Sequence, residues 1–265
     1  WQVLLALASA FLLAQLFGKM AGETAAFLTH AKRDALSGPI VVPAMLASEL
    51  ALLLVSLLTP LLAALPIGET LGLGAAKPRV FAAVSLGTVA LGPLGDRLMS
   101  LFSELFPKLT LGVVPALHEL AQSLPFVWLW PSFALLPGLC EELLFRGVLQ
   151  RAIVRPGIAI AVSGCAFALF HVDPVHVVGV LPLGLFLAWS AQRSSTSVSI
   201  VAHIVNNSLA VISIQSSALD MGYGADQDLP WPWVAASLLL FVLAAGLVAH
   251  DTEPPPSAAS PNALA

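Results

Sequence analysis

The sequence predicts an all-α fold, a polytopic membrane helix bundle of about eight transmembrane helices. Hydrophobic residues make up 58% of the 265 residues and charged residues only 10%, whereas roughly 25% of a soluble domain is charged. Long, mostly apolar stretches recur along the whole chain, and about 20 such residues cross a hydrocarbon core of about 30 Å. The net charge of −4 and the absence of basic runs argue against nucleic acid as a partner.

The predicted spans are separated by segments that are richer in polar residues, glycine and proline. In chain order they are Trp1–Phe17, Ile40–Leu65, Val80–Gly95, Phe126–Gln150, Gly157–Val172, Val177–Gln192, Ser197–Ser216 and Trp231–Ala249. Long connections are expected at residues 18–39 and 96–124. The second connection has an apolar stripe with helical spacing, which is typical of a helix in the membrane interface.

The charges of the short loops predict how the bundle is oriented. The connections after the second, fourth and sixth spans hold five basic residues and almost no acidic ones: Lys77, Arg79, Arg151, Arg155 and Arg193. Because cytoplasmic loops carry an excess of Lys and Arg, we expect these loops and both termini to be cytoplasmic.

Two carboxylates and a guanidinium lie inside the fourth span, in the run Glu141-Glu142-Leu-Leu-Phe-Arg146. Ionised side chains at membrane depth are costly and usually face a partner or a wet cavity. Glu142 and Arg146 are four residues apart and share a helical face, so they can pair. Glu141 lies about 100° round the helix from Glu142 and is left free to act elsewhere.

Two further polar groups are predicted at a similar depth in other spans. One is Phe167-x-x-x-His171 near the end of the fifth span, and the other is His203-x-x-x-Asn207 early in the seventh. Each group alone has a structural explanation, such as a histidine bonded to a backbone carbonyl or an asparagine bonded to a neighbouring helix. Together they predict a site built from three helices.

The remaining histidines and the cysteines are not expected to take part. Four histidines lie in loops or at helix ends, where we expect them to be solvated: His30, His118, His176 and His250. The only two cysteines, Cys140 and Cys165, lie within predicted spans. This position argues against both a disulfide framework and a cysteine-rich metal site.

The three motifs, in this order on successive hydrophobic helices, resemble those of the CPBP (Abi) family of intramembrane proteases, which includes the CAAX prenyl-protein endopeptidases. The resemblance extends over about Pro131 to Val211, and the segment Leu71-Gly72-Leu73-Gly74 is similar to a short feature of many members. We therefore expect N-terminal transmembrane helices and an interfacial segment at 1–124 and, from the resemblance, a catalytic core at 125–250. The Pro/Ala/Ser-rich composition of residues 251–265 predicts a disordered tail.

The resemblance implies an endopeptidase that cleaves a membrane-associated protein or peptide. Glu141 would activate water as a general base, and His171 would share that water or its proton. His203 and Asn207 would donate hydrogen bonds to the oxyanion. The pair of Glu142 and Arg146 would hold the helix and fix the local field.

The cofactor and the class of function have alternatives. A zinc ion held by Glu141, His171 and His203 is possible in principle, but we favour the metal-free mechanism because these residues lack the two-histidine i,i+4 pairing of an HExxH helix. A transporter or proton relay also uses intramembrane charges, although it is expected to have inverted repeats, and none is evident. An immunity-type scaffold is the third alternative.

Overall fold

The computed structural model describes residues 2–30, 37–216 and 229–252, and within these ranges the chain is helical and has no strand. The all-α prediction is therefore confirmed. The predicted tail falls almost wholly outside the described residues. The helices are α1 (Gln2–Thr29), α2 (Gly38–Leu62), α3 (Ile67–Thr70), α4 (Pro78–Leu105), η1 (Pro107–Leu109), α5 (Val113–Ser123), α6 (Phe126–Trp130), η2 (Pro131–Leu135), α7 (Leu136–Glu142), η3 (Leu143–Leu149), α8 (Pro156–Phe170), α9 (Pro174–Arg193), α10 (Thr196–Gln215) and α11 (Trp231–Asp251).

The polytopic bundle is confirmed by the length and apolar character of the helices. In the described part of the chain, six helices are long and apolar enough to cross a membrane: Leu5–Thr29, Gly38–Leu62, Pro78–Leu105, Pro174–Arg193, Thr196–Gln215 and Trp231–Asp251. The other two predicted spans are also helical but differ in kind. Residues 126–151 form one helix with two wide π-type stretches, and α8 has only 15 residues, about 22 Å at 1.5 Å per residue.

Two of the predicted span boundaries were wrong. The first helix does not end at Phe17 but continues to Thr29, and its polar residues Lys19 and Glu23 are spaced for an i,i+4 ion pair at 4.0 Å. The third predicted span ended at Gly95, whereas α4 continues through Pro93 to Leu105. In both cases the helix continues past the polar residues at which the predicted span ended.

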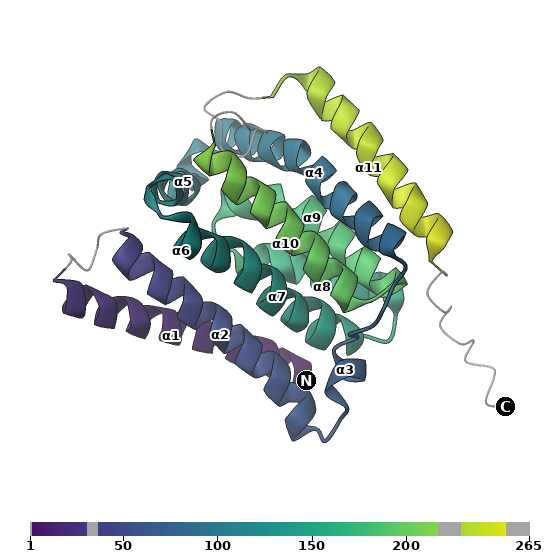
Figure 1. Cartoon of the computed structure of the whole chain (residues 1–265), viewed down its shortest axis with the longest axis horizontal. Coiled ribbons are helices and arrows are strands. Elements are labelled where there is room, and N and C mark those ends of the chain that lie inside the picture. Colours follow the sequence, from purple (N-terminus) through teal and green to yellow (C-terminus); the bar gives the residue numbers. More distant parts are fainter. Residues whose placement is uncertain (1, 31–36, 217–228, 253–265) are drawn as a thin grey trace.

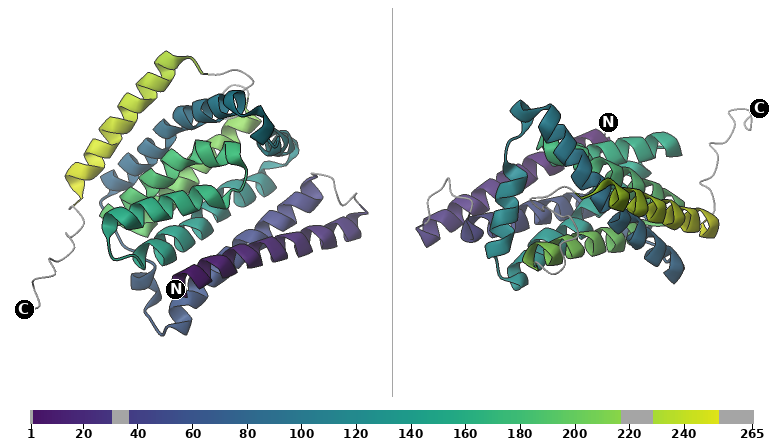
Figure 2. Two further views of the ribbon diagram at one scale, coloured as in Figure 1. Left: turned by 180° about the vertical axis from the view of Figure 1, so that it is seen from behind. Right: turned by 90° about the horizontal axis from the view of Figure 1, so that it is seen from above.

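The helices form a layered bundle with the hairpin of α1 and α2 at one edge and α11 at the other (Figure 1). The hairpin packs through α2 against α7 and η3, whereas α11 packs against α4. Helices α8, α9 and α10 lie between these layers, as the view from behind also shows (Figure 2). The short loops after α2, η3 and α9 lie at the same end of the bundle as the end of α11 (Figure 1). Placement of that end in the cytoplasm stays a prediction.

The helix that carries the first motif is irregular and fits tightly against α10. Pro131 and Pro137 remove backbone donors within it, and π-type turns of the kind found at Leu143–Leu149 often occur at functional sites. At Gly138 a Cβ atom would lie 2.9 Å from the backbone nitrogen of Ile204. The missing side chain therefore lets the first and third motif helices meet backbone to backbone.

Candidate functional site

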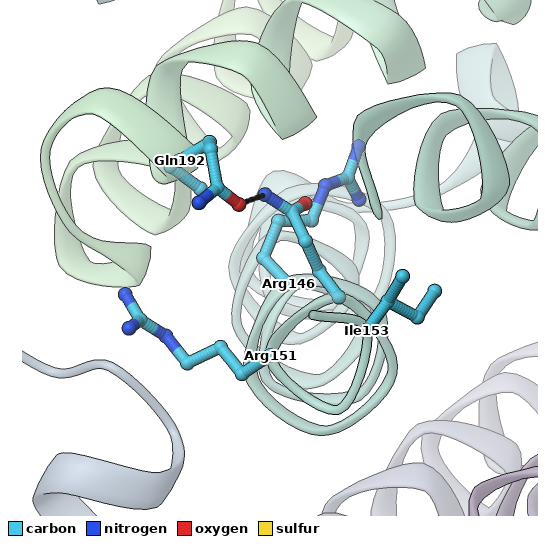
Figure 3. Close-up of a pocket in the computed structure, with 6 residues that line it drawn as sticks. Arg146, Arg151, Ile153 and Gln192 are labelled. Atoms are coloured by element: carbon cyan, nitrogen blue, oxygen red, sulfur yellow. Dashed lines mark hydrogen bonds between the residues drawn. The ribbon is translucent and has the colours of Figure 1, made fainter. Parts of the chain in front are cut away.

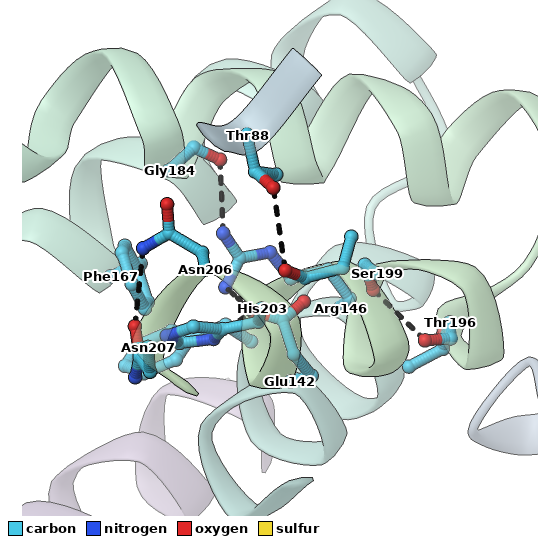
Figure 4. Close-up of polar contacts among 12 residues, drawn as sticks. Thr88, Glu142, Arg146, Phe167, Gly184, Thr196, Ser199, His203, Asn206 and Asn207 are labelled. Atoms are coloured by element: carbon cyan, nitrogen blue, oxygen red, sulfur yellow. Dashed lines mark hydrogen bonds and ion pairs between the residues drawn. The ribbon is translucent and has the colours of Figure 1, made fainter. Parts of the chain in front are cut away.

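The predicted ion pair between Glu142 and Arg146 forms in the interior of the bundle. Arg146 Nη1 lies 2.8 Å from Glu142 Oε1, and neither side chain is exposed. Arg146 Nη2 also donates to the carbonyl oxygen of Gly184 at 3.0 Å, and its guanidinium lies 4.4 Å from the centre of the Phe167 ring. A single arginine thus connects η3, α8 and α9 (Figure 4).

Glu142 also binds the histidine of the third motif. His203 Nδ1 lies 3.0 Å from Glu142 Oε1, and His203 is almost fully buried. Because the carboxylate accepts this hydrogen bond, the proton sits on Nδ1. The Nε2 atom of His203 then donates a hydrogen bond only when the ring carries both protons as an imidazolium. The helical spacing had predicted Arg146 as the partner of Glu142, and the bond to His203 was not predicted.

The ring of His171 is oriented by a backbone contact at the end of α8. His171 Nδ1 donates to the carbonyl oxygen of Phe167 at 3.0 Å, which leaves Nε2 as the acceptor in the neutral ring. The buried Phe167 ring packs edge-on against His171 at 5.1 Å and against His203 at 5.5 Å, measured between ring centres. Phe167 therefore sets the spacing of the two imidazoles.

Four of the six predicted site residues line one cavity of about 440 Å³. They are Glu141, His171, His203 and Asn207, from α7, the end of α8 and α10. The Asn207 side-chain oxygen accepts from Asn206 Nδ2 at 3.2 Å, which helps to fix the orientation of the Asn207 amide at the cavity wall. Glu142 and Arg146 do not line this cavity and lie behind it.

Arg146 borders a second, smaller cavity, which lies toward the end of its helix (Figure 3). This space of about 140 Å³ is also lined by Gln150, Arg151 and Gln192. Gln150 Nε2 donates to the Gln192 side-chain oxygen at 3.1 Å and to the carbonyl oxygen of Ala188 at 2.8 Å. Polar groups therefore continue from the buried pair toward the end of the helix.

Two histidines that were expected to be solvated line the main cavity instead, namely His118 and His176. The centre of the His176 ring lies 4.5 Å from that of His171. The turn between α8 and α9 brings them together, because Val172 adopts a φ of 64° and Asp173 caps α9. The Asp173 Oδ1 atom accepts from the backbone nitrogens of Val175 at 2.9 Å and His176 at 3.2 Å.

Sequence reasoning also missed Glu49, a buried acid of α2 that lines the same cavity. A signal for it was present, because a single carboxylate inside an apolar span is the feature that drew attention to Glu141. Glu49 has no charged residue at i+4 on its helix, whereas the pair of Glu142 and Arg146 drew attention to Glu141.

The arrangement of donors does not fit a zinc ion. Over the described ranges, no three His, Cys, Asp or Glu side chains come together in a group that could hold a metal. Cys140 and Cys165 are both free thiols, in line with the expected absence of a disulfide framework.

Comparison with protein families gives a match to the model described as Type II CAAX prenyl endopeptidase Rce1-like, over residues 123–209. This segment includes all three motifs, and the predicted resemblance to CAAX protease-like proteins is confirmed for it. Neither the curated proteins nor the solved structures contained a significant match.

Proposed function

We propose that this protein is an intramembrane endopeptidase that hydrolyses a peptide bond in a membrane-associated protein or peptide. The observation that carries the proposal is the convergence of a free carboxylate, two imidazoles and an amide on one cavity inside a membrane bundle. The family match over residues 123–209 supports the same class of activity.

Glu141 is the general base of the proposed reaction. Its Oε2 atom is buried and has no hydrogen-bond partner among the described residues, whereas the neighbouring Glu142 is held by Arg146 and His203. A water molecule in the cavity would give a proton to Glu141 while the Nε2 atom of His171 accepts its second hydrogen. The water oxygen would then attack the carbonyl carbon of the substrate.

His203 and Asn207 stabilise the negative charge that develops on the carbonyl oxygen. The side-chain amide of Asn207 is a ready donor because its oxygen is occupied by Asn206. In this role His203 donates from Nε2 as an imidazolium, while Glu142 accepts the hydrogen bond from Nδ1. A preorganised donor of this kind contributes about 3–4 kcal/mol to the transition state.

The chemistry requires no metal step. Glu141 activates the water, and His203 and Asn207 polarise the carbonyl group of the substrate. In a metalloprotease a zinc ion contributes to both of these tasks. The proposed mechanism therefore belongs to the glutamate type.

The proposal is tested by incubating the purified protein in lipid vesicles with a library of membrane-associated peptides. Mass spectrometry then identifies cleaved bonds with and without a chelator. We expect cleavage at defined bonds that the chelator does not suppress and that Glu141→Gln removes. Absence of cleavage by wild-type protein across prenylated and unprenylated peptides would overturn the proposal.

A further inference from the structure

Glu49 is a carboxylic acid buried near the middle of a membrane-spanning helix. It lies on α2, at Gly38–Leu62, and only 7% of its surface is exposed. More than ten residues separate it from either helix end, which is roughly 16 Å at 1.5 Å per residue. A glutamate side chain cannot extend that far to the headgroups, so the acid must be accommodated inside the protein.

Glu49 lies on the inward face of α2, whereas leucine side chains lie on the outward face of the same helix. Leu50, Leu54 and Leu58 are exposed along one side of α2, whereas Leu52 and Ser56 are buried with Glu49. This inner face packs against α7 and η3, and Glu49 lines the same cavity as Glu141. The acid thus faces the site where the proposed reaction takes place.

Glu49 and Glu141 each have one carboxyl oxygen that makes no hydrogen bond to another described residue. The Oε2 atom of each is buried, and neither has a hydrogen-bond partner among the described residues. The two side chains are close enough to interact electrostatically, and the interaction is a repulsion when both are ionised. Arg146 also interacts electrostatically with Glu141, but its ion pair is with Glu142.

We propose that Glu49 is the general acid of the active site, a role that rests on the proposed endopeptidase function. These roles require that Glu49 begins the cycle with a proton and Glu141 begins it as a carboxylate, so that the two carboxyl groups hold one proton between them. Two carboxyl groups in different environments commonly divide the acid and base roles of a hydrolase in this way.

The protons balance over one cycle. Glu141 takes a proton from water as the water oxygen bonds to the carbonyl carbon and the carbonyl electrons move to oxygen. Glu49 gives its proton to the peptide nitrogen as the carbon–nitrogen bond breaks, which releases an amine and a carboxylic acid. The proton on Glu141 then passes to Glu49 and restores the resting state.

Other titratable groups also surround the two acids. Cys140 adjoins Glu141 on α7, and His203 on α10 is hydrogen-bonded to Glu142. The remaining groups line the cavity from α4, α5 and the turn before α9: Asp96, His118, His171, Asp173 and His176. Glu49 shares the wall of the cavity with Glu141, and the two carboxyl groups interact electrostatically.

The test compares two substrates that differ only in the leaving group. One is a cleavable peptide amide and the other is an activated aryl ester of the same acyl portion, whose leaving group needs no proton. Glu49→Gln is expected to lower kcat/KM for the amide by about a hundredfold or more, while the rate on the ester changes less than about threefold. Glu141→Gln should lower both rates, because both need activated water.

Controls separate the acid role from a structural one. Met45→Leu changes the same cavity wall on the same helix without a titratable group, and both of its rates should match wild type. Should Glu49→Gln fail to fold, Glu49→Asp gives the same comparison, because it keeps the carboxyl but withdraws it by one methylene. A pH profile adds an independent readout, since loss of the acid should remove the decline of amide cleavage at alkaline pH.

Two outcomes would overturn the assignment. Equal losses on the amide and the ester would assign Glu49 to structure, and wild-type amide cleavage by Glu49→Gln would remove it from the reaction. If the wild-type protein cleaves neither substrate, the endopeptidase function fails and the assignment of Glu49 fails with it.

Discussion

Glu142 and His203 are joined by a buried hydrogen bond of 3.0 Å although they are 61 positions apart in the chain. The bond connects the first motif to the third and makes one unit of a carboxylate, a guanidinium and an imidazole. A charge that was expected only to secure a helix therefore also orients a residue that faces the cavity.

Replacement of Glu141 by glutamine is expected to abolish proteolysis and to leave the protein folded. The substitution keeps the shape of the side chain but removes the base that accepts a proton from water. Cleavage of a confirmed substrate and the melting temperature in detergent are measured together. Turnover at the wild-type rate by a folded Glu141→Gln protein would exclude this residue as the base.

Arg146→Ala is expected to destabilise the protein more than Glu142→Gln does. Removal of the cation leaves the buried carboxylate of Glu142 without its ion-pair partner, and breaking a buried ion pair in this way costs about 3–5 kcal/mol. In Glu142→Gln the arginine retains the carbonyl oxygen of Gly184 and the Phe167 ring. Thermal unfolding in detergent measures the difference, and equal melting temperatures would mean that water already screens the pair.

His203→Ala and Asn207→Ala should each lower kcat by about a hundredfold or more with little change in KM. A donor that engages the developing oxyanion acts mainly in the transition state. Metal content by plasma mass spectrometry provides the control, and we expect no stoichiometric metal in wild type or in either variant. A bound metal that disappears in His203→Ala would contradict the metal-free mechanism.

Asp173→Ala is expected to lower both stability and activity, whereas Asp173→Asn should preserve most of both. The alanine loses an N-cap worth about 1 kcal/mol, and with it the turn that sets His176 against His171. The asparagine oxygen can still accept from the backbone nitrogens of α9. Melting temperatures and cleavage rates of the two variants, measured side by side, decide whether the cap or the charge matters.

The sequence predicted those parts of the site that depend on spacing within one helix. Glu142 and Arg146 lie on one face by helical periodicity, and their pair forms as expected. The depth of His171 and His203 also followed from position along a span, and both line one cavity.

What could not be predicted depends on how separate helices pack. The bond from Glu142 to His203 requires the close contact of α7 with α10, which no local pattern encodes. The inward position of His176 follows from the turn at Val172, whose positive φ is unusual for a β-branched residue. Glu49 was missed because a lone acid on a helix has no neighbour that reveals its purpose.

The close approach at Gly138 means that one absent side chain governs the distance between two motifs. A methyl group there would have to push Ile204 and its helix aside, which would stretch the link from Glu142 to His203 without altering any reactive group. The residue at position 138 thus controls the distance between α7 and α10. A substitution there could slow turnover while the binding surface for a substrate is kept. Such a variant would be a means of capturing natural substrates in the membrane.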